Sequence, residues 1–318
     1  MSKSVYVYLG EGLAKYSFGE DHPFGPRRHA AFEHEFKRQH LQQQVQLCEP
    51  VTTTQDKIEY FHAHDYVEKV KTMSEIGGGY LDGGDTPAFT GMFEVASLVV
   101  GTTLDAIQQL MQGSCKRAFI PIAGLHHARR DGAAGFCIFN DCGVAIEVLR
   151  RDYDIKRVAY VDIDAHHGDG VFYGFEDDPD LIFADLHEDG HFLYPGTGFA
   201  NETGLGDAKG TKLNIPMPMG ARDNDFMRAW DKVEKFIRDA KPEIILLQCG
   251  ADSLDGDPIT HLQYSEKAHA HATARLCKIA DEYCDGRIIA MGGGGYNLDN
   301  LARAWCAVVK AFVEHTDA

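Results

Sequence analysis

The sequence predicts an α/β fold in which a central parallel sheet carries helices on both faces. Two observations support this prediction. Short apolar runs, which are typical of strands, alternate along the chain with longer stretches of helical periodicity. Several of these runs are apolar at every position, as expected for strands that helices cover on both faces. With 318 residues and 44% hydrophobic content, the chain can bury a large core.

The elements of this fold can be placed in chain order. The expected strands are the apolar runs at residues 5–8, 118–122, 158–163, 181–184, 244–248 and 288–291. The expected helices are the periodic stretches at residues 93–111, 142–151, 224–240, 265–283 and 297–313. No repeat or linker divides the chain, and the irregular segment 76–87 is typical of a surface loop. We therefore expect one domain over residues 1–318.

Composition excludes several classes of function. The net charge of -17 argues against direct nucleic-acid binding, which needs arrays of Lys and Arg. No apolar segment approaches the ~20 residues of a membrane span, and residues 1–4 lack the apolar region of a signal peptide. The eight cysteines include no CxxC pair, so we expect reduced thiols and assign none to metal. These features, with no basic localisation run, favour a bacterial cytoplasmic protein. The oligomeric state stays open.

The segment Asp162-Ile-Asp164-Ala-His166-His167-Gly-Asp169-Gly170 carries the strongest chemical pattern in the chain. It begins as the apolar run ends, and strand alternation places Asp162 and Asp164 on one face. The chain leaving the strand can bring His166 back beside Asp164, and together they would supply two ligands for a divalent ion. Taken alone, the segment could also be a polar turn after a core strand.

Asp252 is the natural third ligand. The apolar run 244–249 ends in Gly250-Ala251 and then presents this carboxylate. Three protein ligands leave one position open, which is typical of catalytic zinc sites, whereas structural sites usually fill all four positions with Cys and His. Considered by itself, Asp252 could also be a helix cap or a turn acid.

The consecutive residues His126 and His127 form the second strong pattern. They follow an apolar run, so both can line the floor of a cavity if the chain turns there. Asp162 and Asp169 can each partner one of them, which would fix the tautomer and raise the basicity of the opposite ring nitrogen. An unpaired double histidine would instead be a feature of the surface or the core edge. All these clusters follow predicted strands, where sites of α/β sheets are found.

Six segments in this order resemble the zinc-dependent histone deacetylase family: Leu125-His126-His127-Ala, Gly135-Phe136-Cys137-Ile-Phe-Asn140-Asp141, Asp162 to Gly170, Pro195-Gly-Thr-Gly198, Gln248-Cys-Gly-Ala-Asp252 and Gly292-Gly-Gly-Gly-Tyr296-Asn297. The resemblance runs from about His22-Pro23 to the C-terminus. It is strongest to the class I branch and to the bacterial acetoin-utilisation relatives. It implies a three-layer arginase-like fold with an eight-stranded parallel sheet, although only six strands can be found in the sequence. It also implies a narrow tunnel that leads an acylated lysine to the metal.

The resemblance also implies catalytic roles. Zinc, or alternatively Fe(II), would be held by Asp164, His166 and Asp252, and would lower the pKa of a bound water to roughly 7. The implied pairs are His126 with Asp162 and His127 with Asp169. His127 would be the general base and then the proton donor to the lysine nitrogen, while His126 tunes the field. The hydroxyl of Tyr296, which follows the flexible run Gly292 to Gly295, would stabilise the oxyanion.

Further residues would shape the tunnel and its surroundings. The implied walls are Gly135, Phe136 and Tyr194. Many relatives have Phe at the position of Tyr194, so its additional hydroxyl could alter substrate preference. Asp85 would bind the substrate backbone at the rim, and Arg28 would line an internal channel for acetate release. A structural potassium ion would be bound by Asp162, Asp164, His166, Asp185 and Leu186. Many relatives have Ser in place of Asp185, and we expect this extra carboxylate to tighten cation binding.

The function expected from these residues is hydrolytic removal of acetyl or other short acyl groups from lysine side chains of proteins or peptides. An acetylpolyamine amidohydrolase is the near alternative, although no long insert of the kind those relatives carry precedes His126 or follows Gly170. A silent acyl-lysine binder is disfavoured because the ligands, both histidines and Tyr296 are intact. A binuclear manganese ureohydrolase is disfavoured because Ser253-Leu254 stands where its second ligand acid would follow.

Overall fold

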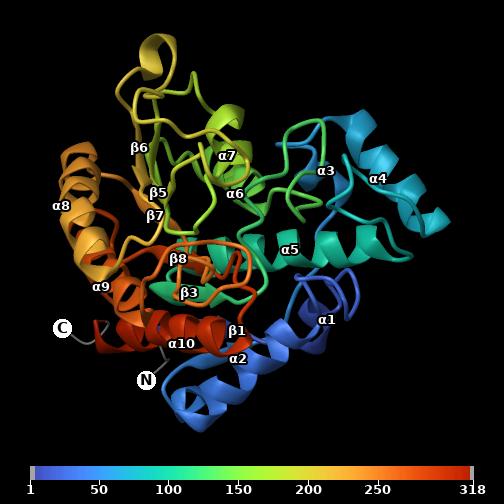
Figure 1. Cartoon of the computed structure of the whole chain (residues 1–318), viewed down its shortest axis with the longest axis horizontal. Coiled ribbons are helices and arrows are strands. Elements are labelled where there is room, and N and C mark those ends of the chain that lie inside the picture. The colour runs from blue at the N-terminus through green and yellow to red at the C-terminus, as the bar shows by residue number, and fades with distance from the viewer. Residues whose placement is uncertain (1–3, 316–318) are drawn as a thin grey trace.

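The computed structural model describes residues 4–315, and its centre is an eight-stranded sheet (Figure 1). The strand order is β2-β1-β3-β8-β7-β4-β5-β6, and all neighbouring strands are parallel. The predicted parallel α/β class is confirmed, and so are the eight strands that the family resemblance implied. In chain order the strands are β1 (Val5–Tyr8), β2 (Gln46–Cys48), β3 (Arg117–Ile120), β4 (Val158–Asp162), β5 (Leu181–Glu188), β6 (Lys212–Met217), β7 (Ile244–Gln248) and β8 (Ile288–Met291).

The sequence predicts the six inner strands but not the two edge strands, β2 and β6. Inner strands are covered by helices on both faces and are therefore apolar throughout. In contrast, β2 has only three residues, none of them fully buried, and β6 contains Pro216 and several half-buried residues. Strand β5 extends past residue 184, where the predicted strand ended. The polar residues Asp185 and His187 gave no apolar signal, yet both are buried in the sheet, where their side chains pair at 2.6 Å.

Helices cover both faces of the sheet (Figure 1). On one face, α8 (Asp223–Ala240) packs on β5 and β6, α9 (Glu266–Tyr283) packs on β7 and β8, and α10 (Leu298–Glu314) contacts β1. On the other face, α5 (Met92–Met111) packs on β3 and β8 and lies beside α6 (Asp141–Tyr153). The other helical segments are α1 (Glu11–Ala14), α2 (Arg27–Arg38), η1 (Leu41–Gln43), α3 (Gln55–Ile58), α4 (His64–Ile76), α7 (Asp169–Gly174) and η2 (Gly206–Ala208).

All five expected helices are present, and three of them begin at a polar cap. The side chain of Asn140 accepts a hydrogen bond from the Gly143 N–H at the start of α6, and Ser265 and Asn297 cap α9 and α10 in the same way. The sequence does not predict α2 and α4. Both are rich in charged and polar residues and bury only a few apolar side chains, so no apolar run marks them in the sequence.

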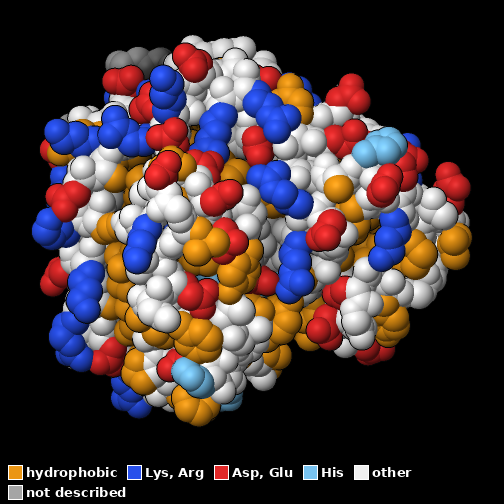
Figure 2. Space-filling view, turned by 90° about the horizontal axis from the view of Figure 1, so that it is seen from above, with side chains coloured by type: hydrophobic (Ala, Val, Ile, Leu, Met, Phe, Trp, Pro, Cys, Tyr) orange, Lys and Arg blue, Asp and Glu red, His pale blue; other side chains and the backbone are white. Residues whose placement is uncertain are grey.

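The surface of the described chain mixes charges of both signs. Figure 2 shows acidic and basic side chains interspersed on one face, with hydrophobic side chains between them. No helix within residues 4–315 has the length and apolar character needed to cross a membrane. All eight cysteines are free thiols. Residues 1–3, part of the segment considered for a signal peptide, and residues 316–318 of the expected domain lie outside the described chain.

The carboxyl ends of the inner strands bring the predicted site residues together. Because β3, β8, β7, β4 and β5 are neighbours and parallel, the loops that follow them leave the sheet at one edge. These loops carry the histidine pair after β3, the glycine run after β8, Asp252 after β7 and the Asp164 segment after β4. The fold thus places residues more than a hundred positions apart within reach of one another.

Candidate active site

Asp164, His166 and Asp252 converge at this edge of the sheet. The Nδ1 atom of His166 lies 3.0 Å from Oδ1 of Asp164 and 3.1 Å from Oδ2 of Asp252. All three side chains are buried, and their ligand atoms lie within 4.8 Å of one another. In the described part of the chain, no other group of His, Cys, Asp or Glu side chains converges in this way. Two carboxylates and one imidazole form a donor set that suits a divalent ion.

The electrostatics of this triad also fit a cation. Burial opposes charge on His166, but its hydrogen bonds to Asp164 and Asp252 outweigh burial and raise its pKa to about 10. Burial, followed by the charge of Asp164, raises the pKa of Asp252 to about 7. Two charged carboxylates that are buried within 4.8 Å of each other need a positive partner to be stable. A divalent ion would take that role in place of the imidazolium.

Gln248, the last residue of β7, holds the triad in place. Its Nε2 donates to Oδ2 of Asp164 at 2.9 Å, and its Oε1 accepts from the N–H of Gly250 at 2.7 Å. The Gly294 N–H donates to the same Asp164 oxygen at 2.9 Å. A Cβ at Gly250 would overlap the Asp164 carboxylate, so no larger residue fits there. No role was predicted for Gln248 from the sequence, although a polar residue at the end of an apolar strand is a signal that could have indicated one.

We expect Gln248→Ala to weaken metal binding by about 10- to 100-fold, the usual cost of removing a residue that orients a metal ligand. The substitution removes the donor to Asp164 and the acceptor for Gly250 together. Competition with a chromophoric chelator measures the affinity. Gln248→Glu keeps the acceptor but sets a carboxylate against Asp164, so its loss should be larger. Unchanged affinity in both variants would contradict this role.

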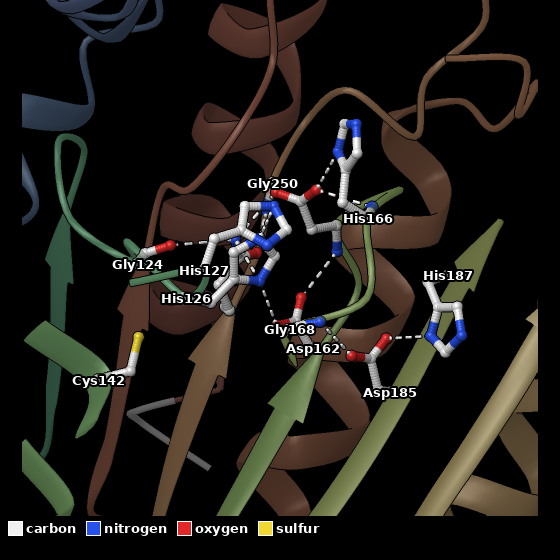
Figure 3. A network of polar contacts seen from close by, with 12 residues as sticks. Gly124, His126, His127, Cys142, Asp162, His166, Gly168, Asp185, His187 and Gly250 are labelled. Atoms are coloured by element: carbon white, nitrogen blue, oxygen red, sulfur yellow. Dashed lines mark hydrogen bonds and ion pairs between the residues drawn. The ribbon is translucent and has the colours of Figure 1, made fainter. Parts of the chain in front are cut away.

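The two histidines each lie against an acid, in the pairing that the family resemblance implied. Nδ1 of His126 is 2.8 Å from Oδ2 of Asp162, and Nδ1 of His127 is 2.7 Å from Oδ1 of Asp169. Their Nε2 atoms are only 3.1 Å apart, and Figure 3 shows the two rings together, with His126 linked to Asp162. Burial, and then the neighbouring His126, lower the pKa of His127 to about 4. His127 is therefore neutral near pH 7 and can accept a proton at Nε2.

A cavity of about 230 Å³ opens onto this site. Tyr194 forms one aromatic wall, with its ring centroid 5.1 Å from that of His127, and Phe136 and Tyr296 form another, at 5.9 Å. Burial, followed by the charge of Asp252, raises the pKa of Tyr296, which keeps its hydroxyl protonated as a donor. Apolar walls around a polar floor suit a chain of methylene groups that ends in an amide. The lining residues are Asp85, His127, Gly135, Phe136, His166, Leu193, Tyr194, Ile259 and Tyr296.

Phe136 and Asp85 are held by their surroundings. Phe136 has a left-handed backbone with φ of 68°, and its N–H and C=O bond to the hydroxyls of Thr86 and Tyr16. Asp85 is an exposed residue on the loop expected at 76–87. The carboxylate of Asp82 organises this loop by accepting hydrogen bonds from three backbone N–H groups and from the Thr86 hydroxyl. Asp82 was not predicted from the sequence. Its Asp-Gly-Gly-Asp context is a turn pattern that could have revealed it.

Arg28 lies deep inside the protein, although an arginine is more often at the surface. Its guanidinium donates to the carbonyl oxygens of Gly295 at 2.8 Å and Gly293 at 2.5 Å. It therefore sits behind the glycine run that leads to Tyr296. Its Nη1 atom is buried and has no hydrogen-bond partner among the described residues. An unpaired donor in such a place is a candidate contact for a small anion.

The residues implied in potassium binding are also buried together. The pKa of Asp162 is raised by burial and then by the charges of Asp185 and Asp164, which indicates an environment that favours a cation. However, the two nitrogens of His187 face Oδ1 of Asp185 at 2.6 Å and the Gly198 carbonyl at 2.8 Å (Figure 3). Burial opposes charge on this ring, but the carboxylate of Asp185 raises the pKa of His187. A protonated His187 would offset the charge of Asp185 and weaken its effect on cation binding.

This chain is similar to known proteins in sequence and in fold. A model of the histone deacetylase domain matches residues 22–312. The acetoin utilization protein AcuC of Bacillus subtilis (strain 168) is 36% identical over 317 residues, which cover 97% of this chain and 81% of that protein. AcuC of Staphylococcus aureus (strain MRSA252) is 32% identical over 323 residues, covering 99% and 82%. The crystal structure of the HDA15 HD domain aligns with a TM-score of 0.91 at 26% identity, covering 99% of this chain and 90% of that one. This chain therefore belongs to the histone deacetylase family and is a hydrolase of the deacetylase type.

Proposed function

We propose that this protein removes acetyl or other short acyl groups from lysine side chains of proteins or peptides with the help of a bound zinc ion. One observation carries the proposal: the triad of Asp164, His166 and Asp252 adjoins an aromatic-walled cavity, which its member His166 lines together with His127 and Tyr296. An acyl-lysine has the matching shape, because its apolar stem ends in a single amide.

Asp164, His166 and Asp252 would hold the ion, and Fe(II) is the alternative to zinc. When bound, such an ion polarises the amide carbonyl and increases the acidity of a water molecule. Neutral His127 takes a proton from the attacking water at Nε2, while Asp169 accepts the Nδ1 proton and keeps the ring oriented. His126 and Asp162 would set the electrostatic field around His127 during this proton transfer. These roles need no covalent intermediate and no organic cofactor.

Tyr296 would stabilise the tetrahedral oxyanion by donating its hydroxyl proton in a hydrogen bond. Protonated His127 then delivers its proton to the lysine nitrogen as the carbon–nitrogen bond breaks, and acetate and free lysine result. Phe136, Tyr194 and Gly135 would pack the lysine stem. Asp85 at the rim would accept hydrogen bonds from the substrate backbone.

Two buried features, Arg28 and a potassium site, would support this chemistry without contacting the lysine stem. Arg28, with its unpaired Nη1, would bind the departing acetate inside the protein. A structural potassium ion would take oxygen ligands from Asp162, Asp164, His166, Asp185 and Leu186. Both assignments follow the family resemblance, and burial of these groups supports them.

A panel of acyl substrates tests the proposed substrate class. Purified metal-loaded protein would be assayed on peptides that carry acetyl-, propionyl-, butyryl- or lactyl-lysine, and on acetylputrescine and acetylspermidine. We expect the peptides to be hydrolysed with the higher kcat/KM, because Asp85 can bind a peptide backbone. Preferred turnover of the acetylpolyamines would assign the protein to the alternative amidohydrolase activity. No turnover of either group would refute both.

Metal affinity should rise with pH. Protonated His166 and Asp252 cannot bind a cation, and their pKa values of about 10 and about 7 mean that ion binding releases protons at neutral pH. Each released proton makes the affinity grow about tenfold per pH unit. Chelator competition at pH 6, 7 and 8 measures this slope. An affinity independent of pH would show that these side chains do not bind the ion.

A further inference from the structure

Asp257 joins two chain segments that line the cavity. Its side chain is buried, and its carboxylate accepts three backbone hydrogen bonds. Oδ2 accepts from the N–H groups of Tyr296 at 2.8 Å and Asn297 at 3.4 Å, while Oδ1 accepts from the N–H of Ile259 at 3.1 Å. Tyr296 and Ile259 both line the cavity, whereas Asp257 does not.

The loop that carries Asp257 is also fixed to the first turn of α10. Nδ2 of Asn297 donates to the Gly256 carbonyl at 3.1 Å, and Nδ2 of Asn300 donates to the Asp255 carbonyl at 2.9 Å. Asn297 is at the same time the N-cap of α10. The carboxylate of Asp257 is therefore tied to a rigid element, and it can hold Tyr296 in a defined place.

Tyr296 needs such an anchor. It follows four glycines, and Gly293 and Gly295 have φ angles of 65° and 119°, so local sterics restrict this backbone little. Among residues 4–315, no hydrogen bond holds the Tyr296 hydroxyl. Its position depends on ring packing against Phe136 and Arg28 and on two hydrogen bonds to the peptide group that precedes it. Arg28 donates to the Gly295 carbonyl of that group, and Asp257 accepts from its N–H. The hydrogen bond to Asp257 is the one contact made directly by the Tyr296 N–H.

We propose that Asp257 is a positioning residue, which sets the Tyr296 hydroxyl for reaction without touching the substrate. The inference rests on the proposed function and adds a residue to it. A displacement of about 1 Å at a catalytic group can cost on the order of 10²-fold in rate, so one misplaced backbone bond is sufficient. If Asp257 acts through Tyr296, its effect must disappear when the Tyr296 hydroxyl is absent.

A double-mutant cycle tests this dependence on an acetyl-lysine peptide. Tyr296→Phe should lower kcat by about 10²- to 10³-fold, as loss of one oxyanion donor does. Asp257→Ala should lower kcat by about 10- to 100-fold with KM changed less than about threefold. Added to Tyr296→Phe, the same Asp257→Ala change should cost less than about threefold. Equal losses in both backgrounds would overturn the proposal.

Two more variants separate positioning from folding. Asp257→Asn keeps one oxygen that can accept from the Tyr296 N–H, so it should retain clearly more activity than Asp257→Ala. Asp255→Ala removes an exposed carboxylate from the same loop and should behave as the unmodified protein. Metal content should stay near one ion per chain in every variant. Loss of metal in Asp257→Ala, or no advantage of Asn over Ala, would contradict a positioning role.

Crystal structures give a readout that does not depend on turnover. In Asp257→Ala, we expect the Tyr296 hydroxyl to move by about 1 Å or more relative to the unmodified protein. An unmoved hydroxyl would overturn the inference. If the unmodified protein hydrolyses no acyl-lysine peptide, the proposed function fails, and the structural comparison still decides whether Asp257 places Tyr296.

Discussion

Asp252→Ala should abolish metal binding and hydrolysis together. The substitution leaves Asp164 and His166 as the only ligands, and two ligands hold a catalytic ion poorly. Because a bound ion supplies several kcal/mol of transition-state stabilisation, its loss should lower kcat/KM by on the order of 10³-fold or more. Metal analysis of the purified variant and the peptide assay measure the two effects.

The matched control for this variant is again Asp255→Ala, three residues further along the same loop. It should keep one ion per chain and full activity, since its side chain is exposed. Thermal unfolding of both variants shows whether either has lost its fold. An Asp252→Ala protein that is folded, retains its ion and turns over peptide at the normal rate would refute the metal site.

His127→Ala should lower kcat by about 10²- to 10⁴-fold, the range typical of a lost general base and acid. Metal content should not change, because His127 is not one of the three ligands. The pH profile gives a second readout. With a pKa of about 4, the base is unprotonated at neutral pH. When enough metal is present to keep the site filled, activity of the unmodified protein should fall as the pH approaches that value from above.

His64→Ala is the control for a lost imidazole, because His64 is exposed on α4 and pairs with Glu59 away from the cavity. It should leave kcat unchanged. A His127→Ala variant that retains more than about a tenth of the activity would show that another group transfers the proton. A variant that loses its metal would show that His127 acts through the ion site instead.

The sequence revealed the inner part of the fold much better than its margins. Strands such as β4 and β7 are apolar at nearly every position because helices cover both of their faces. The edge strands β2 and β6 lack this signature, because β2 has no fully buried residue and half of the β6 residues are only partly buried. Helix α2 escaped detection for a related reason: few of its residues are apolar, and its buried face includes Arg28 and His29.

Within the site, residue type and local context were sufficient for some residues and not for others. Asp164 and His166 are two positions apart, so their proximity can be inferred from the segment alone. Gln248 and Asp257 act through backbone and side-chain groups on other loops, and nothing in their local sequence names those partners. Asp185 was identified, but its pairing with His187 emerged only from the structure.

The sequence by itself determined the α/β class, the strands of the sheet interior and the residue types available for chemistry, because burial and periodicity leave local patterns. Only the tertiary structure decided which of those residues meet. Asp164 accepts a hydrogen bond from Gly294, 130 positions away, and His126 lies against Asp162, 36 positions away. Such contacts depend on strand order and on the common edge at which parallel strands end, and neither property is encoded in any single segment.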